Sequence, residues 1–258
     1  LDKLSLSNRL VQITHAMFMR CVRGGHEQPD AFRSSQNWNE SSSLLNATII
    51  APHQDGVPDL MADLEAFWHN QNIAVPHLVR LAIVHYQFET IHPFLDGNGR
   101  IGRLLMPLYL VGHGLLAKPS LYLSDFFERN RASYYDALMR VRLANDLAQW
   151  VRFFLQGVAQ TAGKGRDVFR QILSVRTETE QKIMAMGKRA SLARQALHLL
   201  YQKPILAAND LIQELHISQP TANALLREFV KLGILREVTG ASRNRIYSFE
   251  AYLELFTK

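Results

Sequence analysis

The chain has 258 residues, 47% of them hydrophobic, and carries 29 Lys or Arg against 23 Asp or Glu, a formal net charge of +6. This length and composition predict two domains with buried cores, and the basic balance favours acidic partners. No apolar run reaches the ~20 residues of a membrane-spanning helix, so none is predicted. A single cysteine, Cys21, excludes an internal disulfide and is interpreted as core filling. Because the chain begins with Leu1 and shows no signal-peptide pattern, we expect a fragment of a longer cytoplasmic protein.

Apolar periodicity predicts a mostly α-helical chain. Pro58 and Pro76 each occupy a position typical of a first helical turn, and the apolar residues that follow them recur at helical spacing. His85 lies on the apolar face of the second of these helices and is expected to be packed. Between Ala47 and Asp55, β-branched residues followed by turn residues predict a short strand and a turn. A plain connecting loop is the alternative there.

The segment from 92 to 103 reads HPFLDGNGRIGR and combines an imidazole, a carboxylate, two guanidiniums and a glycine-rich turn. Gly97, Asn98 and Gly99 tolerate positive φ, so their N–H groups can turn inward and form an anion site. A helix is expected from Ile101 to Leu110, so that the anion site opens onto a helix N-terminus, where the dipole favours phosphate. These groups are the parts needed to hold a polyphosphate and to transfer one of its phosphoryl groups.

The charged side chains of this segment suit the same chemistry. Arg100 and Arg103 lie three apart on one helical face and can fork onto phosphate oxygens, while Asp96 can hold Mg²⁺ that bridges those oxygens. Pro93 is expected to hold His92 extended in a loop, within reach of a hydroxyl that attacks the bound phosphorus. An Asx turn at Asp96 and surface ion pairs for the two arginines are the alternatives.

Further along the chain, Ser124 is expected to cap a helix that continues to Arg142, and Asn145 or Asp146 to cap the next helix. The glycine-containing run at 161–165 predicts a domain boundary. The predicted divisions are a catalytic domain at 1–162, a linker or connecting helix at 163–189 and a second domain at 190–258.

The second domain shows three helical patterns, at 192–200, 209–215 and 218–232, with Ser218 as the cap across a tight junction. Two strands are expected at 234–237 and 245–249, around a turn. This order of elements resembles a winged helix, which contains a helix-turn-helix.

DNA is one candidate partner of this domain. Residues 185–258 carry ten Lys or Arg against six Asp or Glu, a bias that favours polyanions or acidic protein surfaces. The exposed side of the third helix and the wing tip offer side chains suited to phosphates and base edges: Gln219, Thr221, Asn223, Arg227, Lys231, Arg243 and Arg245. A packing or dimerisation module is the alternative, so DNA and a homodimer both stay open.

The segment 92–103 also resembles the signature of Fic domains, H-x-F-x-[DE]-G-N-G-R-x-x-R. Every fixed position is met, by His92, Phe94, Asp96, Gly97, Asn98, Gly99, Arg100 and Arg103. The resemblance covers roughly residues 5–160 and includes Arg33, Gln36 and Trp38 upstream and Asn130, Arg131, Tyr134 and Tyr135 downstream. It implies a helical Fic fold in which the strand and turn at 47–55 form a β-hairpin flap, which lines up the target segment beside the catalytic histidine.

Fic enzymes are mostly protein adenylyltransferases, which move AMP from ATP to a protein hydroxyl and release pyrophosphate, and the resemblance implies this activity here. It makes His92 the base for a Tyr, Thr or Ser hydroxyl and Asp96 the holder of Mg²⁺, and it directs Arg103 to the γ-phosphate. The implied ATP-binding residues are Gly97, Asn98, Gly99, Arg100, Arg103, Asn130 and Tyr135. For the last two, which match a region that contacts the nucleoside in relatives, core packing is the alternative. The implied partners are ATP and a target protein, this protein itself included.

Two further features bear on the implied activity. In a branch of the family that phosphorylates its target, a lysine replaces the second motif glycine, whereas this chain has Gly99, which favours AMP transfer.

Many Fic proteins carry an inhibitory helix with the pattern [ST]-x-x-x-E-[GN], which residues 1–258 lack. We therefore expect Arg103 to be free of the glutamate that pairs with it in those proteins. The alternatives are a Fic-fold enzyme with another donor, such as UTP or a phosphocholine carrier, and a DNA-binding regulator with a vestigial Fic domain.

Overall fold

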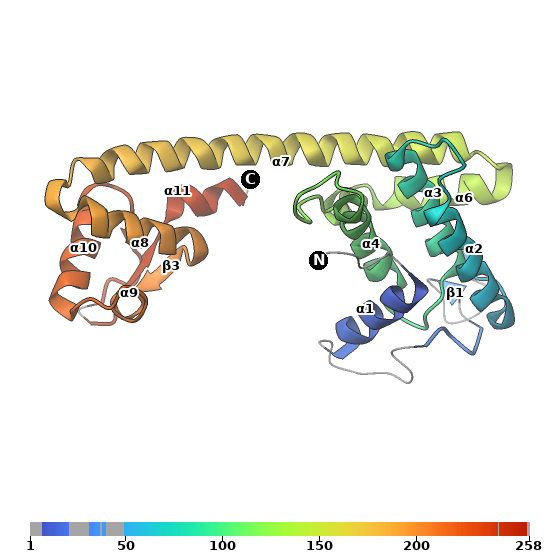
Figure 1. Cartoon of the computed structure of the whole chain (residues 1–258), viewed down its shortest axis with the longest axis horizontal. Helices are drawn as coiled ribbons and strands as arrows, with labels where there is room; N and C mark the ends of the chain where they lie inside the picture. The colour runs from blue at the N-terminus through green and yellow to red at the C-terminus, as the bar shows by residue number, and fades with distance from the viewer. Residues whose placement is uncertain (1–6, 21–30, 37, 40–48, 242, 257–258) are drawn as a thin grey trace. The chain divides into compact units, whose positions relative to one another are not determined.

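The computed structural model describes residues 7–20, 31–36, 38–39, 49–241 and 243–256, and it is mostly α-helical, as predicted (Figure 1). The chain forms two compact units, residues 1–163 and 164–258, here called the N-terminal and C-terminal units. The predicted linker at 163–189 stays a prediction, and the interpretation of Cys21 concerns a residue outside those described. No helix in the described ranges combines the length and apolarity needed to cross a membrane.

Helices dominate the N-terminal unit. Its elements are α1 (Asn8–Arg20), β1 (Trp38–Asn39), β2 (Ile49–Ile50), the 3-10 turn η2 (Gln54–Gly56), α2 (Val57–His69), α3 (His77–Ile91), α4 (Asn98–Gly112), α5 (Ser124–Arg129), α6 (Arg131–Ala144) and the start of α7 (Leu147–Met184). Pro58 lies in the first turn of α2 and Pro76 directly precedes α3. The expected strand is present as β2, which pairs antiparallel with β1, Trp38 opposite Ile50.

Helix α3 is the central helix of the N-terminal unit and packs between α2 and α4. Its residues Leu81 and Phe88 are 1% exposed, as is Met106 of α4. Trp150 of α7 is fully buried, and its indole Nε1 donates a hydrogen bond of 2.8 Å to the Ala82 carbonyl. This packing fixes the end of α3 and the start of α4, which are joined by residues 92–97.

Gly102 lets α3 and α4 approach closely. A Cβ added there would lie 2.5 Å from the Oε1 atom of Glu89 and 3.1 Å from the ring of Phe88. We expect Gly102→Ala to lower the free energy of unfolding by about 1 to 3 kcal/mol, because it overpacks the core. Gly163→Ala in α7 is the matched control, since its Cβ would meet nothing within 4 Å. It should stabilise by up to ~1 kcal/mol in urea unfolding; equal losses in both variants would contradict this account.

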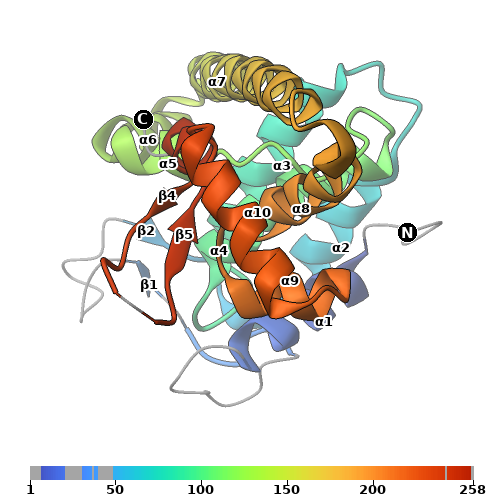
Figure 2. The same ribbon diagram turned by 90° about the vertical axis from the view of Figure 1, so that its left-hand side faces the viewer.

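The C-terminal unit contains the rest of α7, the 3-10 turn η3 (Gly187–Arg189), α8 (Ala190–Gln202), β3 (Ile205–Ala207), α9 (Ala208–Leu215), α10 (Gln219–Lys231), β4 (Arg236–Glu237), β5 (Ile246–Ser248), α11 (Glu250–Leu253) and the 3-10 turn η4 (Glu254–Phe256). The three helices expected after residue 190 are present. Ser218 caps α10, because its hydroxyl accepts a hydrogen bond from the Thr221 N–H at 3.4 Å. The strands form an antiparallel sheet in the order β3-β5-β4, with β4 and β5 side by side in Figure 2. The short strand β3 was not predicted.

The prediction of one helix from Ser124 to Arg142 is wrong. Helix α5 ends at Arg129, and Asn130 leaves the helical conformation with φ −113° and ψ 33° before α6 begins. The Asn130 side chain provides the reason, because its Nδ2 donates to the Phe126 carbonyl at 2.8 Å and satisfies the end of α5. Ser124 forms no capping hydrogen bond and is already the first residue of α5.

Helix α7 begins where predicted but continues past the domain boundary predicted at 161–165. Asp146 caps it, since its Oδ1 accepts a hydrogen bond of 3.1 Å from the Gln149 N–H. The helix then continues through Gly163 and Gly165 to Met184, although the sequence predicted a break there. Each glycine costs about 1 kcal/mol in a helix, which is too little to end a helix with favourable flanks.

Candidate functional site

His92 ends α3 in the left-handed region, with φ 50° and ψ 62°, and its N–H donates to the Phe88 carbonyl at 2.9 Å. The prediction that Pro93 holds His92 extended is therefore wrong. The hydrogen bond that closes the helix outweighs the preference of a residue before proline for extended backbone. A non-glycine residue in this conformation is strained, and such residues cluster at functional sites. His92 as a whole is 9% exposed.

Arg33 fixes the backbone on which His92 sits. Arg33 is 4% exposed, and its Nε donates to the His92 carbonyl at 2.9 Å while its Nη1 donates to the Ser35 carbonyl at 3.0 Å. The Arg33 N–H donates to the Pro93 carbonyl at 2.8 Å. These bonds tie residues 92 and 93 to the segment before β1, so Arg33 positions the histidine. The sequence pointed to Arg33 only through the Fic resemblance.

Asn98 holds the loop between α3 and α4 from within. Its Oδ1 accepts from the Phe94 N–H at 2.8 Å, its Nδ2 donates to the Phe94 carbonyl at 2.7 Å, and the residue is 1% exposed. His15 of α1 supports the same loop, because it stacks on Phe94 at 3.8 Å and its Nε2 donates to the Asp96 carbonyl at 3.0 Å. The side-chain amide of Asn98 is thus engaged by the Phe94 backbone, and Asn98 can contact a ligand only through its backbone N–H. No sequence pattern had pointed to His15.

The predicted anion site has a different form in the structure. Helix α4 begins at Asn98, three residues earlier than expected, and within the three-residue turn only Gly97 has positive φ, at 80°. Asn98 and Gly99 therefore lie in the first turn of α4, where backbone N–H groups have no partner within the helix. The site is a helix N-terminus, which favours anions through these groups and the dipole.

The two motif arginines lie in different surroundings. Arg100 forms an exposed ion pair with Asp96 at 3.2 Å, and its guanidinium stacks over Phe18 at 4.8 Å. Arg103 folds back over the first turn of α4, since a Cβ on Gly99 would lie 3.1 Å from its Nη1. Both arginines lie in α4 three residues apart, as predicted, but their side chains have different neighbours. Arg103 lies beside the anion site, whereas Arg100 shows the alternative, a surface ion pair.

Asp96 is the candidate magnesium ligand. Its Oδ1 accepts from the Gly97 N–H at 2.6 Å, and its side chain is about half exposed. The described residues include no group of three His, Cys, Asp or Glu side chains that could hold a metal. One carboxylate nevertheless fits Mg²⁺, which is commonly held by one or two carboxylates together with substrate phosphates. The pair with Arg100 is exposed and worth at most ~1 kcal/mol, so a cation can displace it.

The electrostatic surroundings keep the His92 imidazole neutral. The pKa of His92 is lowered to about 4, mainly by burial, and the positive charges of Arg33 and Arg142 contribute to this lowering. The Glu89 carbonyl and the Asp96 carboxylate oppose this shift. At neutral pH the ring therefore has a lone pair available to accept a proton, as a general base requires.

A buried polar cluster lies next to Arg103. Glu89 is 8% exposed, its Oε1 has no hydrogen-bond partner among the described residues, and burial raises its pKa to about 7 while Arg103 opposes the rise. His85, packed as predicted, lies 4.0 Å from Glu89 and 3.1 Å from the Tyr134 hydroxyl. Burial and the Arg103 charge lower the pKa of His85 to about 3, so the ring is neutral. Sequence reasoning missed Glu89, which has no motif of its own.

The raised pKa of Glu89 predicts a pH-dependent stability. The folded protein keeps a proton on Glu89 that the unfolded chain releases near pH 4.5, so this group lowers the free energy of unfolding as pH rises from about 4.5 through about 7. Glu89→Gln has no charge to bury. Its stability relative to wild type should increase across this window by about 1.4 kcal/mol per unit of pKa shift.

Urea unfolding between pH 5 and 8 measures this difference, in which the contributions of His85 and His92 cancel because both proteins contain them. Asp63→Asn, on the exposed side of α2, is the control and should show no such increase. A constant difference between wild type and Glu89→Gln would contradict the assignment.

The predicted nucleoside contacts are Asn130 and Tyr135. Asn130 lies at the junction of α5 and α6, and Tyr135 lies within α6. The Asn130 amide bonds to Phe126, as described above. Tyr135 is half-buried against the core, with the Arg131 guanidinium 5.8 Å from its ring and Tyr134 in edge contact at 5.4 Å. Their surroundings match the core-packing alternative, and their role toward a nucleotide stays a prediction.

Residues 5–110 match the model of the Fic/DOC family. A probable protein adenylyltransferase, aq_aa38 of Aquifex aeolicus (strain VF5), is 32% identical over 114 residues, 44% of this chain and 31% of that protein. Protein adenylyltransferase Fic of Drosophila erecta is 31% identical over 172 residues, 66% of this chain and 31% of that protein. The crystal structure of a Fic family protein from Desulfovibrio desulfuricans G20 is 27% identical with a TM-score of 0.56, covering 94% of this chain and 68% of that one.

The N-terminal unit therefore contains a Fic/DOC domain, and it includes all of the residues from His92 to Arg103. The chain has homologues that are named protein adenylyltransferases, at about 31% identity. It spans about a third of the length of these two relatives.

Proposed function

We propose that this chain is a protein adenylyltransferase that moves AMP from ATP to a Tyr, Thr or Ser hydroxyl of a target protein. The observation that carries the proposal is the pairing of a neutral, buried His92 with the N-terminus of α4, only a few residues further along a loop that Arg33 and Asn98 hold by hydrogen bonds. A base and an anion site at that separation suit attack by a hydroxyl on a bound phosphate. The names of the homologues favour adenylyl transfer within this chemistry.

In the proposed reaction, the N–H groups at the start of α4 bind the α- and β-phosphates and Arg103 binds the γ-phosphate. His92 accepts the proton of the target hydroxyl as its oxygen bonds to the α-phosphorus, and the bond to the β-phosphate oxygen breaks to release pyrophosphate. Positioning and charge stabilisation supply most of the acceleration in phosphoryl transfer. When bound, Mg²⁺ supplies additional neutralisation of the phosphates, and Asp96 is the residue that would hold it. Arg33 and Asn98 keep the loop in place throughout.

The groups at the start of α4 and Arg103 suit the phosphates of a nucleotide rather than its base, so several donors have to be compared. The protein should be incubated with Mg²⁺ and a candidate target lysate, using ATP, GTP, CTP and UTP labelled on the α-phosphate in parallel. We expect label to enter protein from ATP in preference to the others. Preferential labelling from UTP would establish a Fic-fold transferase with another donor and reject adenylyl transfer.

We also propose that the C-terminal unit is a winged-helix domain. The support is the arrangement of α8, α9 and α10 with the three-stranded sheet, in which the β4–β5 connection forms the wing.

A further inference from the structure

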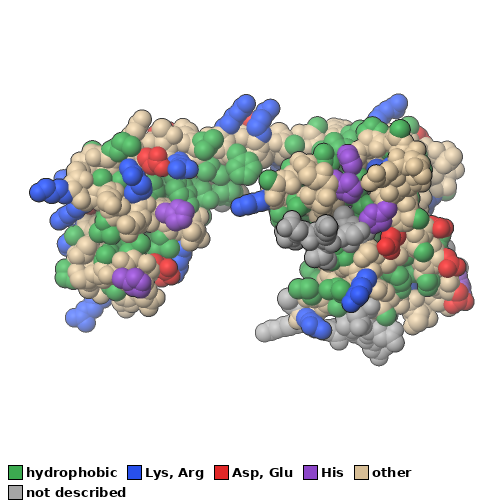
Figure 3. Space-filling view, in the orientation of Figure 1, with side chains coloured by type: hydrophobic (Ala, Val, Ile, Leu, Met, Phe, Trp, Pro, Cys, Tyr) green, Lys and Arg blue, Asp and Glu red, His purple; other side chains and the backbone are tan. Residues whose placement is uncertain are grey.

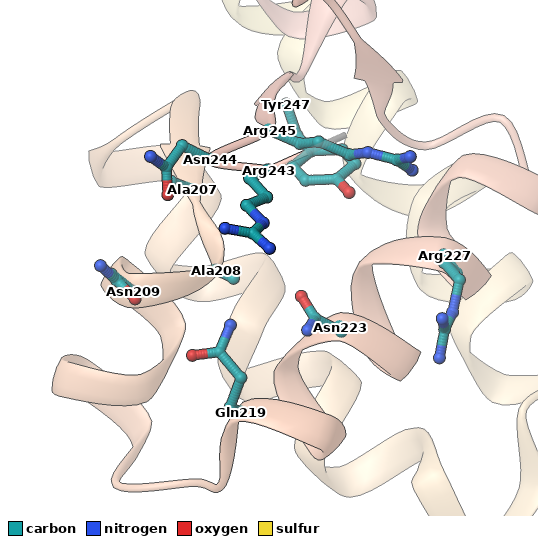
Figure 4. A pocket seen from close by; sticks show the side chains of 10 residues that line it. All are labelled: Ala207, Ala208, Asn209, Gln219, Asn223, Arg227, Arg243, Asn244, Arg245 and Tyr247. Carbon is teal, nitrogen blue, oxygen red and sulfur yellow. The ribbon is translucent and has the colours of Figure 1, made fainter. Parts of the chain in front are cut away.

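We infer that the C-terminal unit binds double-stranded DNA through the face between α10 and the β4–β5 connection, here called the wing face. A cavity of about 560 Å³ opens on this face (Figure 4), lined by Ala207, Ala208, Asn209, Gln219, Asn223, Arg227, Arg243, Asn244, Arg245 and Tyr247. Three of these residues are arginines, four are asparagine or glutamine, and none is acidic. The inference rests on the C-terminal unit alone and is independent of adenylyl transfer.

Helix α10 presents a polar face to this cavity. Gln219, Asn223 and Arg227 are spaced four residues apart and so follow one side of the helix. The opposite side is buried in the core through Ala222, Leu225, Leu226 and Phe229. The three polar side chains are therefore not needed for packing. A helix anchored on one side, with amides and a guanidinium along the other, suits the edges of base pairs.

The wing supplies the facing wall. Figure 4 shows the Arg243 side chain pointing across the cavity toward Gln219 and Asn223. The wing holds its own shape, because the Glu237 Oε1 accepts hydrogen bonds of 2.9 Å from the Thr239 and Gly240 N–H groups. Arg245 adds a bond of 2.7 Å from its Nε to the Ala241 carbonyl. These bonds fix residues 237–240 and tie Arg245 to Ala241, which limits the ordering cost of binding for the described part of the wing.

The wing face carries an excess of positive charge, although Arg245 lies near enough to the Glu237 carboxylate to lower its pKa. Two other nearby carboxylates have different partners, Asp210 with Lys203 at 2.5 Å and Glu228 with Arg189 at 3.1 Å. Among the described residues, neither Arg227 nor Arg243 forms an ion pair. Several Lys and Arg side chains are visible on the surface of this unit in Figure 3. A surface with this excess of positive charge attracts a polyanion.

The shape of the wing face selects duplex DNA among polyanions. The major groove of B-form DNA is about 12 Å wide and admits an α-helix, where Asn and Gln pair with adenine and Arg with guanine. The deep, narrow major groove of A-form RNA does not admit one. Tyr247 is the single aromatic residue of the lining and is buried. Single strands, which bind by stacking on exposed aromatic rings, therefore find no platform.

The test uses the complete 258-residue chain and a fluorescently labelled random-sequence DNA duplex, with binding followed by anisotropy between 50 and 300 mM salt. We expect a dissociation constant on the order of 10⁻⁴ to 10⁻⁶ M at physiological salt. On a random-sequence duplex we count Arg227, Arg243 and Arg245 as phosphate contacts, and for three such contacts the slope of log K against log salt should be about −3. Arg227→Ala with Arg243→Ala should reduce that slope by about two and leave adenylyl transfer unchanged.

Arg194→Ala is the matched control, because Arg194 is an exposed arginine of the same unit that lines a different cavity, together with His198 and Tyr201. It should bind like the parent chain. The inference is overturned if the double variant binds like the parent, if Arg194→Ala weakens binding equally, or if no duplex binding occurs up to 10⁻⁴ M at 50 mM salt. Equal or tighter binding of duplex RNA or of single-stranded DNA also overturns it.

Discussion

His92→Ala should reduce the rate of AMP transfer by at least ~10²-fold while ATP affinity stays within a few-fold of wild type. The reduction follows from loss of a positioned base, which contributes about 10²- to 10⁴-fold. ATP binding persists because the imidazole precedes the helix N-terminus and contributes none of its N–H groups. Initial rates with α-labelled ATP, together with ATP titration by calorimetry, measure the two quantities separately.

Because His92 has left-handed backbone, replacing it with alanine adds strain. His92→Asn is therefore the second variant, since asparagine tolerates this conformation and cannot act as a base at neutral pH. The control is His216→Asn, at the end of α9, where another histidine has φ 52°. We expect the His92→Asn variant to be as inactive as His92→Ala and the His216→Asn variant to be active. Full transfer by either His92 variant would reject the assignment of the base.

The low pKa of His92 adds a pH signature to the same experiment. A histidine with an ordinary pKa of 6.5 loses its lone pair to a proton as pH falls through that value. With its pKa lowered to about 4, His92 should stay neutral, and transfer by the wild type should not decline between pH 8 and 6 on account of this group. A half-maximal rate near pH 6.5 in the free enzyme would contradict the described surroundings of the imidazole.

Arg103→Ala should lower transfer by roughly 10- to 100-fold, because the γ-phosphate loses a charge-assisted fork worth about 1.5 to 3 kcal/mol. The loss should appear partly in KM for ATP, since the proposed contact exists in the ground state as well. Arg100→Ala is the matched control: Arg100 is engaged by Asp96 and Phe18, so its removal should cost less than that of Arg103.

Both arginine variants must be compared at equal concentrations of folded protein, because Arg103 also lies near Glu89. Its removal takes away a positive charge that lowers the Glu89 pKa, so folding and activity change together. A larger loss for Arg100→Ala than for Arg103→Ala would show that the exposed arginine is the one that binds phosphate.

The sequence predicted the helices well where apolar residues repeat over long stretches, as in α2, α3 and α10, because helical periodicity is strongest there. The sequence did not predict the helix ends correctly where a single residue determines whether the helix stops. Asn130 ends α5 by bonding to Phe126, while Gly163 and Gly165 do not end α7. The three-residue strand β3 is too short to show an alternating pattern of its own, and its pairing with β5 is set by the fold.

The candidate site could likewise be predicted from the sequence only in part. The chemical groups of residues 92–103 could be read from the sequence, but their arrangement depends on contacts from distant segments. Arg33 and His15 fix the loop from the N-terminal part of the chain, and neither contact can be deduced from local spacing. The left-handed conformation of His92 and the internal use of the Asn98 amide likewise arise only once α3 and α4 are packed.

The most direct test of the central proposal is to incubate the purified protein with Mg²⁺ and ATP labelled on either the α- or the γ-phosphate, with a lysate as target. After denaturing electrophoresis, we expect label in protein bands from the α-phosphate alone, and mass spectrometry should locate one AMP on a Tyr, Thr or Ser side chain. The His92→Asn variant should show no label. Transfer of the γ-label, or equal α-labelling by the variant, would contradict adenylyl transfer with His92 as its base.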